Sequence, residues 1–406
     1  MNHRSENALL PAQPFFSTPQ QRLALARQRY FEEGVRPSGL VSESVIQSWA
    51  RCLQAQRHPN EAISFATVTA SRAHSAVTRS RILLAAASNE LSQLETTLAG
   101  TSCTVLLTDP QGIVVHSAHA GYNADEVLLP LARRVGSNLG EDSIGTNAPG
   151  ITAHTGEPSV VLGGEHFFGS VQVMHCAAAP IHDIHGQVAG VLDVTSESRP
   201  FGFDAAAVVG LYATAIENRL LRAQATEHIV VHLQTSAAFL GTPMEGLAGI
   251  ASDGRIAWMN RAASRLLGVA VVSPSLYADA VFALDLHSLA ALTRRTDAAP
   301  HRLPNGLNVW LLARMHARDG AQQVFKPAAP AHVTPMPPQP PQPPAASPWP
   351  AIEAQAAAVQ GTLRESELHL IERALQACGG NVSKAARALG VSRGLVYRHL
   401  KQARKT

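Results

Sequence analysis

The stretch CTVLLTDPQGIVVH, residues 103–116, contains two short runs of apolar and β-branched residues on either side of the turn sequence TDPQG. Runs of this kind, bounded by Asp, Pro and Gly, are typical of a β-hairpin. Three further runs follow, and a second turn sequence, HDIHG, joins the last two of them. These runs are PSVVLGG, QVMHCAAAPI and QVAGVLDVT. A sheet is therefore predicted within residues 99–225.

Segments with helical spacing of apolar residues flank these strands. ADEVLLPLARRVG precedes the third run, and FDAAAVVGLYATAIENRLLRAQ follows the last. Helical patterns also dominate the preceding segment, in TPQQRLALARQRYFEEG, SESVIQSWARCLQAQ and SRILLAAASNELSQLETTLAG. Residues 1–98 are thus predicted to be a helical region, and residues 99–225 an α+β domain with helices against one face of the sheet.

A smaller α+β unit is predicted over residues 228–318. Its clearest part is GLAGIASDGRIAWMNRAASRLLGV, in which a strand, a turn, a second strand and a helix follow in order. Asp253 and Gly254 form an Asp-Gly pair, which favours a type I′ hairpin turn. The fold class up to residue 318 is therefore multidomain α+β.

Residues 319–360 are predicted to be a linker, because the composition changes sharply there. From Pro327 to Pro350, 11 of 24 residues are proline and none is Asp, Glu, Lys or Arg. Proline lacks a backbone N–H, so such a segment favours an extended, semi-rigid spacer over a helix or a sheet interior. The alternative for this segment is a ligand for a proline-binding domain.

The charge of the chain is segregated toward residues 362–406. This segment contains nine Lys or Arg and three Glu, a net charge of +6, so the 361 residues before it sum to −3. A basic segment of this kind is the electrostatic footprint of a module that binds a polyanion.

Residues 361–406 have the pattern of three short helices and are predicted to be all-α. LRESELHLIERALQAC is amphipathic, and KAARALG and RGLVYRHLKQARK follow it, each after a capping Asn or Ser. Ala386, Gly390 and Val396 have the spacing at which two helices cross closely through a short turn, as in a helix-turn-helix. The alternative is an ordinary helical hairpin with a solvated basic face.

In a helix-turn-helix, the third helix would present its first residues to base edges and its later residues to phosphates. Arg393 is the candidate for base recognition, and Arg398 and Lys401 are candidates for phosphate contact. The full set of predicted DNA-binding residues is Lys384, Ser392, Arg393, Gly394, Tyr397, Arg398 and Lys401. The expected partner is double-stranded operator DNA.

The stretch GNVSKAARALGVSRGLVYRHLK resembles the C-terminal DNA-binding domain of Fis-type regulators. Gly394 departs from that pattern, because alanine is usual there. Glycine inside a helix costs about 1 kcal/mol and leaves no side chain to contact DNA.

Residues 140–195 resemble the GAF sensor domain of the acetoin-catabolism activator family, and SESVIQSWARC resembles the helical lead-in of that family. The 228–318 unit resembles a PAS domain. The matching elements in the sensor are Gly145-Thr146-Asn147, Glu165-His166-Phe167, Cys176, Ala179-Pro180-Ile181 and Gly190-Val191-Leu192-Asp193. The resemblance implies a sensor for a small-molecule effector.

One domain of that family is missing between the sensor and the helix-turn-helix. Family members usually carry there an ATPase that remodels RNA polymerase bearing sigma-54, and such a domain needs the phosphate-binding sequence G-x-x-x-x-G-K-[ST]. This sequence contains no Gly-Lys pair, and it lacks a GAFTGA loop. The resemblance therefore implies effector sensing and DNA binding without ATPase activity, with RNA polymerase as a further candidate partner.

Four residues of the sensor are predicted to line an effector pocket. A small polar ligand needs a few directed hydrogen bonds in an apolar cavity, which favours Asn147 and His166. Phe167 and Cys176 complete the set, with a place in the hydrophobic core as the alternative for each.

The alternative function is a metal- or redox-responsive regulator. Histidine, cysteine and acidic residues crowd into residues 165–185, and such side chains bind zinc or iron. Their spacing matches no standard metal site, and strand alternation places His175 and Cys176 on opposite faces. A catalytic Cys176 needs a positioned base, which nothing in the sequence supplies. No metal, cofactor or enzymatic activity is predicted.

The remaining composition favours a cytoplasmic protein. No uninterrupted apolar run reaches the length of a membrane span, and the first residues lack the apolar core of a signal peptide. The four cysteines form no CxxC pair, which favours reduced thiols. A homodimer is expected, through either the stripe Leu368, Ile371 and Leu375 or the stripe Ile216, Leu220 and Leu221.

Overall fold

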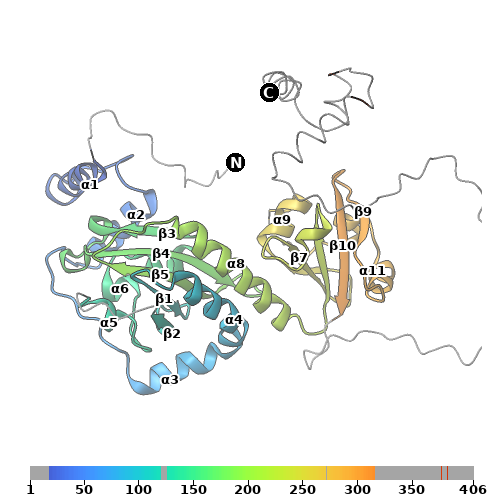
Figure 1. The fold of residues 1–406 in the computed structure, drawn as a ribbon, viewed down its shortest axis with the longest axis horizontal. Coiled ribbons are helices and arrows are strands. Elements are labelled where there is room, and N and C mark those ends of the chain that lie inside the picture. The colour runs from blue at the N-terminus through green and yellow to red at the C-terminus, as the bar shows by residue number, and fades with distance from the viewer. Residues whose placement is uncertain (1–17, 120–125, 271, 316–375, 377–381, 383–406) are drawn as a thin grey trace, which may run out of the picture. The chain divides into compact units, whose positions relative to one another are not determined.

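The computed structural model describes residues 18–119, 126–270 and 272–315, together with Gln376 and Val382 (Figure 1). The chain divides into two compact units, Met1–Ala329 and Pro330–Thr406, and the helices and strands given below belong to the first. The predicted linker, 319–360, lies outside the described residues, as does nearly all of the predicted helix-turn-helix.

The first sheet forms where the five β-branched runs were predicted. All of its strands are antiparallel, in the order β2-β1-β5-β4-β3. The strands are β1 (Cys103–Thr108), β2 (Val114–His119), β3 (Ser159–Leu162), β4 (Met174–His182) and β5 (Val188–Glu197). TDPQG joins β1 to β2, and HDIHG joins β4 to β5, so both predicted hairpins are confirmed.

Eight helices accompany this sheet in the described residues up to 225. Four precede it, whereas the apolar spacing predicted three, because α3 has only one buried residue, Ala76. The predicted helix in ADEVLLPLARRVG is limited to a single turn, α5. The helices are α1 (Pro19–Arg27), α2 (Glu43–Gln54), α3 (Ala70–Arg79), α4 (Arg81–Leu98), α5 (Leu129–Ala132), α6 (Glu141–Ile144), α7 (Ala148–Thr155) and α8 (Ala205–Gln224).

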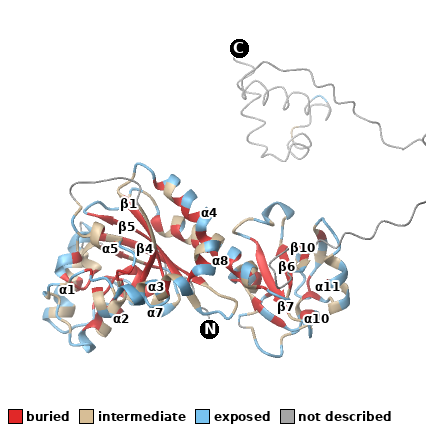
Figure 2. Ribbon diagram, turned by 90° about the horizontal axis from the view of Figure 1, so that it is seen from below, coloured by how far each residue is buried: buried red, intermediate tan, exposed pale blue. Residues whose placement is uncertain are grey.

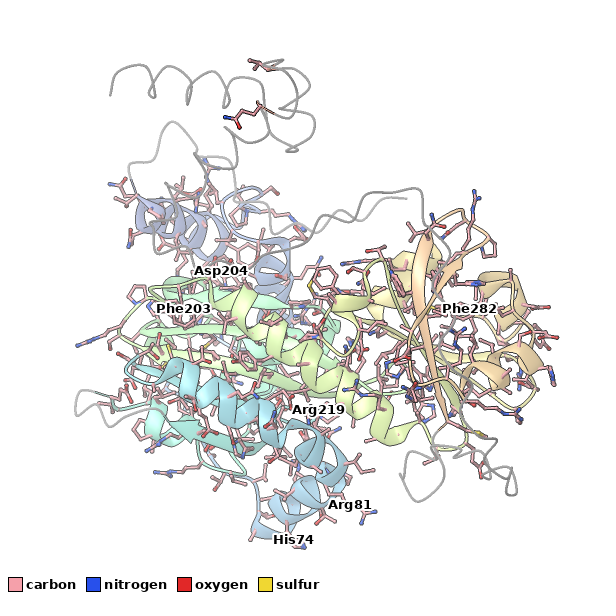
Figure 3. All side chains as sticks on the ribbon, turned by 45° about the vertical axis from the view of Figure 1, so that its right-hand side comes forward. His74, Arg81, Phe203, Asp204, Arg219 and Phe282 are labelled. Atoms are coloured by element: carbon pink, nitrogen blue, oxygen red, sulfur yellow. The ribbon has the colours of Figure 1, made fainter. Side chains whose placement is uncertain are left out.

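Helices cover both faces of the first sheet, so the prediction of helices against one face is wrong. One core contains Trp49 of α2, Leu106 and Phe167 together with residues of α5 to α7. The other lies under α4 and α8, which pack together and are joined by an ion pair of 2.6 Å between Arg219 and Glu90 (Figures 2 and 3). Strands buried on both sides read as continuous apolar runs. These runs were identified as strands in the sequence, but they were not used to decide whether helices cover one face of the sheet or both.

The second sheet has the order β8-β7-β6-β10-β9 and is also antiparallel throughout. Its helices cover a core that includes the fully buried Phe282 (Figure 3). The elements are β6 (Ile229–Gln234), β7 (Gly246–Ile250), β8 (Ile256–Met259), α9 (Arg261–Leu267), α10 (Ala278–Phe282), α11 (Leu286–Leu292), β9 (Ala299–Arg302) and β10 (Asn308–Met315).

The two sheets share one arrangement with a different chain order. In each sheet, a central strand lies between two antiparallel strand pairs, and a group of helices connects these two pairs along the chain. That central strand is β5 in the first sheet, where it comes last, and β6 in the second, where it comes first. Helix α8 therefore connects the two central strands directly.

Four hairpin turns have the same hydrogen bond and a glycine at the same position. In the turns that end at Gly112, Gly186, Gly254 and Gly306, the glycine N–H donates to the carbonyl three residues earlier, and only the glycine takes a positive φ. The φ of Gly254 is 84°, whereas Asp253 is not among the residues with positive φ. A type I′ turn needs positive φ at both central positions, so that prediction for Asp253-Gly254 is wrong.

Helix α8 is not available for the predicted dimer contact. Ile216 and Leu220 are buried in the core shared with α4, and Leu221 packs with Val230 and Trp258 of the second sheet region. The stripe therefore faces inward in the single chain. Within the described residues, no helix is long and apolar enough to cross a membrane.

Candidate ligand-binding site

A small cavity lies on the face of the first sheet opposite α8. About 30 Å³ of it is open to the centres of water molecules. Strands β1, β4 and β5 form one wall, and the segments around α5 to α7 and between β3 and β4 form the others. The lining residues are Phe65, Leu106, Ala132, Leu139, Ile144, Asn147, Pro149, His166, Val171, Met174, Cys176, Asp193 and Thr195.

Asp193 is the most unusual group in this cavity. The side chain of Asp193 is fully buried, and burial raises the pKa of its carboxyl group to about 7. Thr195 Oγ1 donates a hydrogen bond to Oδ2, but Oδ1 is buried without any partner. Because an unpaired buried carboxylate oxygen is costly, this atom is where a ligand that donates a hydrogen bond would be stabilised.

His166 and Cys176 contact each other in the wall of the cavity. His166 Nδ1 lies 2.9 Å from the carbonyl oxygen of Gly163, which can only accept, so Nδ1 carries the proton. Burial lowers the pKa of His166 to about 4, which leaves the ring neutral with Nε2 as an acceptor. Cys176 Sγ lies 3.6 Å from Nε2, and burial raises the pKa of the thiol, so the S–H donates to this nitrogen.

The other two predicted pocket residues have different roles. Asn147 lines the cavity, but its amide caps α7: Oδ1 accepts from Gly150 N at 2.8 Å, and Nδ2 donates to the carbonyls of Leu139 and Gly145. All of its strong hydrogen-bonding groups are thus engaged within the chain. Phe167 does not line the cavity. It packs edge-on against Phe168, with ring centroids 5.0 Å apart, so its assignment to the pocket is corrected to the core.

The sequence analysis missed Asp193 and Thr195 as pocket residues. Both lie in the run QVAGVLDVT, which reads as a buried strand. The available signal was Asp193 itself, since an acidic residue inside a buried strand is rare unless it is paired or functional. Strand alternation then places Thr195 on the same face as Asp193.

Gly145 allows the wall of the cavity to close. Its φ is 69°, and a Cβ at this position would lie 2.7 Å from Cε2 of Phe168. We expect Gly145→Ala to lower the free energy of unfolding by about 2–4 kcal/mol, because it adds left-handed strain to overpacking. Gly186→Ala is the matched control: its φ is 73°, but nothing lies within 4 Å of the added methyl. Urea unfolding of both variants is the measurement, and equal losses would contradict the packing argument.

Of the histidine and cysteine residues between 165 and 185, His166 and Cys176 contact each other, whereas His182 and His185 lie apart from this pair. His182 Nδ1 lies 2.9 Å from Oε2 of Glu217 on α8, and His185 is exposed in the hairpin turn. Nowhere in the part of the chain that the structure describes do three or more His, Cys, Asp or Glu residues stand where they could hold a metal ion. The seven predicted DNA-binding residues, between Lys384 and Lys401, lie outside the described residues.

Two family models match separate parts of this chain. "MimR, N-terminal domain" matches residues 18–212, which contain α1 to α7, the first sheet and the cavity. "Bacterial regulatory protein, Fis family" matches residues 362–402, where the helix-turn-helix was predicted.

Curated relatives cover the same regions. The propane 2-monooxygenase operon transcriptional activator MimR of Mycolicibacterium smegmatis is 28% identical over 71% of this chain and 46% of its own length. The acetoin catabolism regulatory protein of Cupriavidus necator is 29% identical over 56% of this chain and 35% of its own. The acetoin dehydrogenase operon activator AcoR of Bacillus subtilis is 26% identical over 41% and 28%. The chain spans half or less of the length of these relatives.

Among solved structures, the crystal structure of the E. coli DhaR(N)–DhaL complex is similar over 68% of this chain and 99% of the matched chain. Its TM-score is 0.41 and its sequence identity is 15%.

Proposed function

Since this chain is a homologue of the MimR and acetoin-catabolism regulators and carries a Fis-family DNA-binding segment, we propose that it is a transcriptional regulator that senses a small molecule in the cavity beside Asp193. The single observation that supports sensing is the unpaired Oδ1 of Asp193 in a mostly apolar cavity. The first sheet is a GAF-type sensor in this proposal, and the second is a PAS-like relay. The chain acts without hydrolysing ATP, because its sequence has no Gly-Lys pair.

The lining of the cavity supports one chemical class of effector. Its polar groups are Asp193, Thr195, His166 and Cys176, and the other lining side chains except Asn147 are apolar. A ligand of a few carbon atoms with one hydroxyl group would donate to Asp193 Oδ1 and fill the rest with apolar surface. The relatives named above regulate operons of propane and acetoin metabolism, so compounds of that size are the first to test here.

A thermal-shift screen of the full chain tests the sensing proposal. The panel contains short alcohols, diols, hydroxyketones and the corresponding ketones and alkanes. We expect a rise in Tm with hydroxylated members and little effect of alkanes of equal size, because binding to the folded state alone stabilises it. A panel without any effect, or one in which alkanes equal alcohols, contradicts the role of Asp193.

The proposed DNA contacts differ in kind, and this difference is measurable. Arg393→Ala should reduce discrimination at one base pair by about 1–3 kcal/mol, because it removes a contact to base edges. Arg398→Ala should weaken binding to all sequences alike and reduce the salt slope of log K by about one, because it removes a phosphate contact. Fluorescence anisotropy with a selected operator and its point variants, at several salt concentrations, separates the two. The assignment fails if Arg393→Ala behaves like Arg398→Ala.

The working unit in this proposal is a homodimer. One short recognition helix makes few base contacts, and two helices about 34 Å apart would contact one palindrome. With Ile216, Leu220 and Leu221 buried in the single chain, the stripe Leu368, Ile371 and Leu375 is the remaining proposed contact. The proline-rich segment would hold both modules near one operator and raise their local concentration.

A further inference from the structure

The lining of the cavity is buried throughout. All thirteen lining residues are buried, and Phe65, for example, has only 7% of its surface exposed. Asp193 itself has no exposed surface. A solute therefore reaches Oδ1 of Asp193 only after one wall of the cavity has moved.

The walls differ in how they are held. The sheet wall is fixed by paired strands, with β5 bonded to both β1 and β4. The segment between β3 and β4 has only two short 3₁₀ turns, Gly163–Glu165 and Gly169–Val171, and it carries His166. With few backbone hydrogen bonds of its own, this segment is held less firmly by its backbone than the sheet wall.

Two side chains from the N-terminal helices hold this segment in place. Arg27 of α1 donates to three of its carbonyl oxygens: Nη1 to Gly164 at 2.9 Å and to His166 at 2.8 Å, and Nη2 to Phe167 at 3.1 Å. Trp49 of α2 donates from Nε1 to the carbonyl of Glu165 at 2.7 Å. Four consecutive carbonyls, 164 to 167, are thus bonded from outside the segment.

Arg27 itself lies in a helix that packs on the core mainly through half-buried side chains. Its guanidinium lies 4.8 Å from the ring centroid of Phe31 and 5.7 Å from that of Trp49. Ala26 is the only buried residue of α1, and the π-helical turn that follows, Gln28–Glu32, has none. Helix α2 is fixed more firmly, because Arg51 forms two hydrogen bonds with the carboxylate of Glu141 on α6, at 2.7 and 2.8 Å.

We propose that α1 is the gate of the cavity: Arg27 holds residues 164–167 closed over the ligand site, and a ligand enters when Arg27 releases their carbonyls. The ligand rests on the function proposed above, but the gate is a property of the chain alone. Arg27 touches no ligand in this arrangement. It acts by positioning the backbone on either side of His166.

Access to the Cys176 thiol measures the gate without any ligand. The full chain is treated with methyl methanethiosulfonate, and the rate at Cys176 is followed by mass spectrometry of its peptide. We expect Arg27→Ala to accelerate this rate about tenfold or more, since one hydrogen bond to a charged group already corresponds to about a factor of ten. Arg27→Lys keeps the charge but loses the planar fork, so an intermediate rate is expected.

Two controls distinguish opening of the gate from a general loss of stability. Cys103 is buried in the core on the other side of the sheet, and its rate should not change. Arg29→Ala, on the exposed face of the next turn, should leave the rate at Cys176 unchanged. An unchanged Cys176 rate in Arg27→Ala overturns the proposal, and so does equal acceleration at Cys103.

A second variant keeps the test decisive if Arg27→Ala does not fold. Trp49→Phe removes the bond to Glu165 together with part of the fully buried indole, and it keeps an aromatic ring in the cluster. We expect a severalfold faster rate at Cys176 and an unchanged rate at Cys103. An unchanged rate in this variant also counts against the gate. The labelling needs no effector, so a failed gate leaves the thermal-shift result standing, and a failed ligand screen leaves the labelling result standing.

Discussion

Asp193→Asn is expected to make the folded chain more stable at pH 8 while abolishing its response to the effector. Burial raises the pKa of the Asp193 carboxyl group from 3.8 to about 7. A group whose pKa is higher in the folded than in the unfolded state adds stability at low pH and loses it as pH rises between those two values. Above pH 7 the ionised carboxylate therefore destabilises the fold, and asparagine removes that charge.

The size and pH dependence of this effect follow from the same shift. One unit of pKa difference corresponds to 1.36 kcal/mol, so the gain at pH 8 has an upper bound of about 4 kcal/mol. We expect about 2–4 kcal/mol at pH 8 and a much smaller gain near pH 4. Urea unfolding of both proteins at the two pH values is the measurement.

Asp109→Asn provides the matched control. Asp109 is also buried, but its Oδ1 accepts hydrogen bonds from the backbone N–H groups of Gln111 and Ile113, at 3.0 and 2.9 Å. Asparagine keeps an acceptor oxygen for these two bonds, so the variant should gain no stability at pH 8 and should keep the effector response. Loss of stability in Asp193→Asn at pH 8, or a retained thermal shift, would show that Asp193 is structural.

Removing residues 362–406 should abolish DNA binding, with a loss of about 10³-fold or more in affinity for the operator. This segment has a net charge of +6, and the remainder sums to −3, so the truncated chain would be repelled by phosphate. Electrophoretic mobility shift at a fixed salt concentration is the measurement. The effector-induced rise in Tm should persist, because residues 330–406 form a separate compact unit. Retained operator affinity would place DNA binding elsewhere in the chain.

The sequence predicted the hairpins well, because their signals are local. The turns TDPQG and HDIHG lie between paired strands as expected, and a helix follows β5 over FDAAAVVGLYATAIENRLLRAQ. The turn at Asp253-Gly254 was predicted with the wrong geometry, since the Asp-Gly pair favours more than one turn type and the backbone on either side decides. A family model also matches residues 362–402, where the Fis-type segment was predicted.

The candidate site was predicted only in part, because its key features depend on tertiary contacts. Asn147 was assigned to the ligand from its polarity, but the helix start at α7 uses its amide. Asp193 was hidden in an apolar run, and only the position of β5 between β1 and β4 shows that its Oδ1 has no partner. The bonds from Arg27 span 137 to 140 residues of sequence, a distance at which periodicity carries no information.

The opposite chain order of the two sheets has a consequence for synthesis on the ribosome. In the first sheet, β1 pairs with the central strand β5, which lies almost a hundred residues downstream; Cys103, for example, is opposite Ser196. The earlier strands are therefore synthesised before the strand with which they pair. In the second sheet the central strand, β6, emerges first, and β7 joins it with Leu233 opposite Gly246. Nascent β1 to β4 must therefore remain unpaired with their centre until about residue 197 has been translated, whereas the second sheet grows outward from a strand already present. Because long-range pairing is slow and exposes strand edges, the strands of the first sheet are expected to stay exposed longer during synthesis than those of the second.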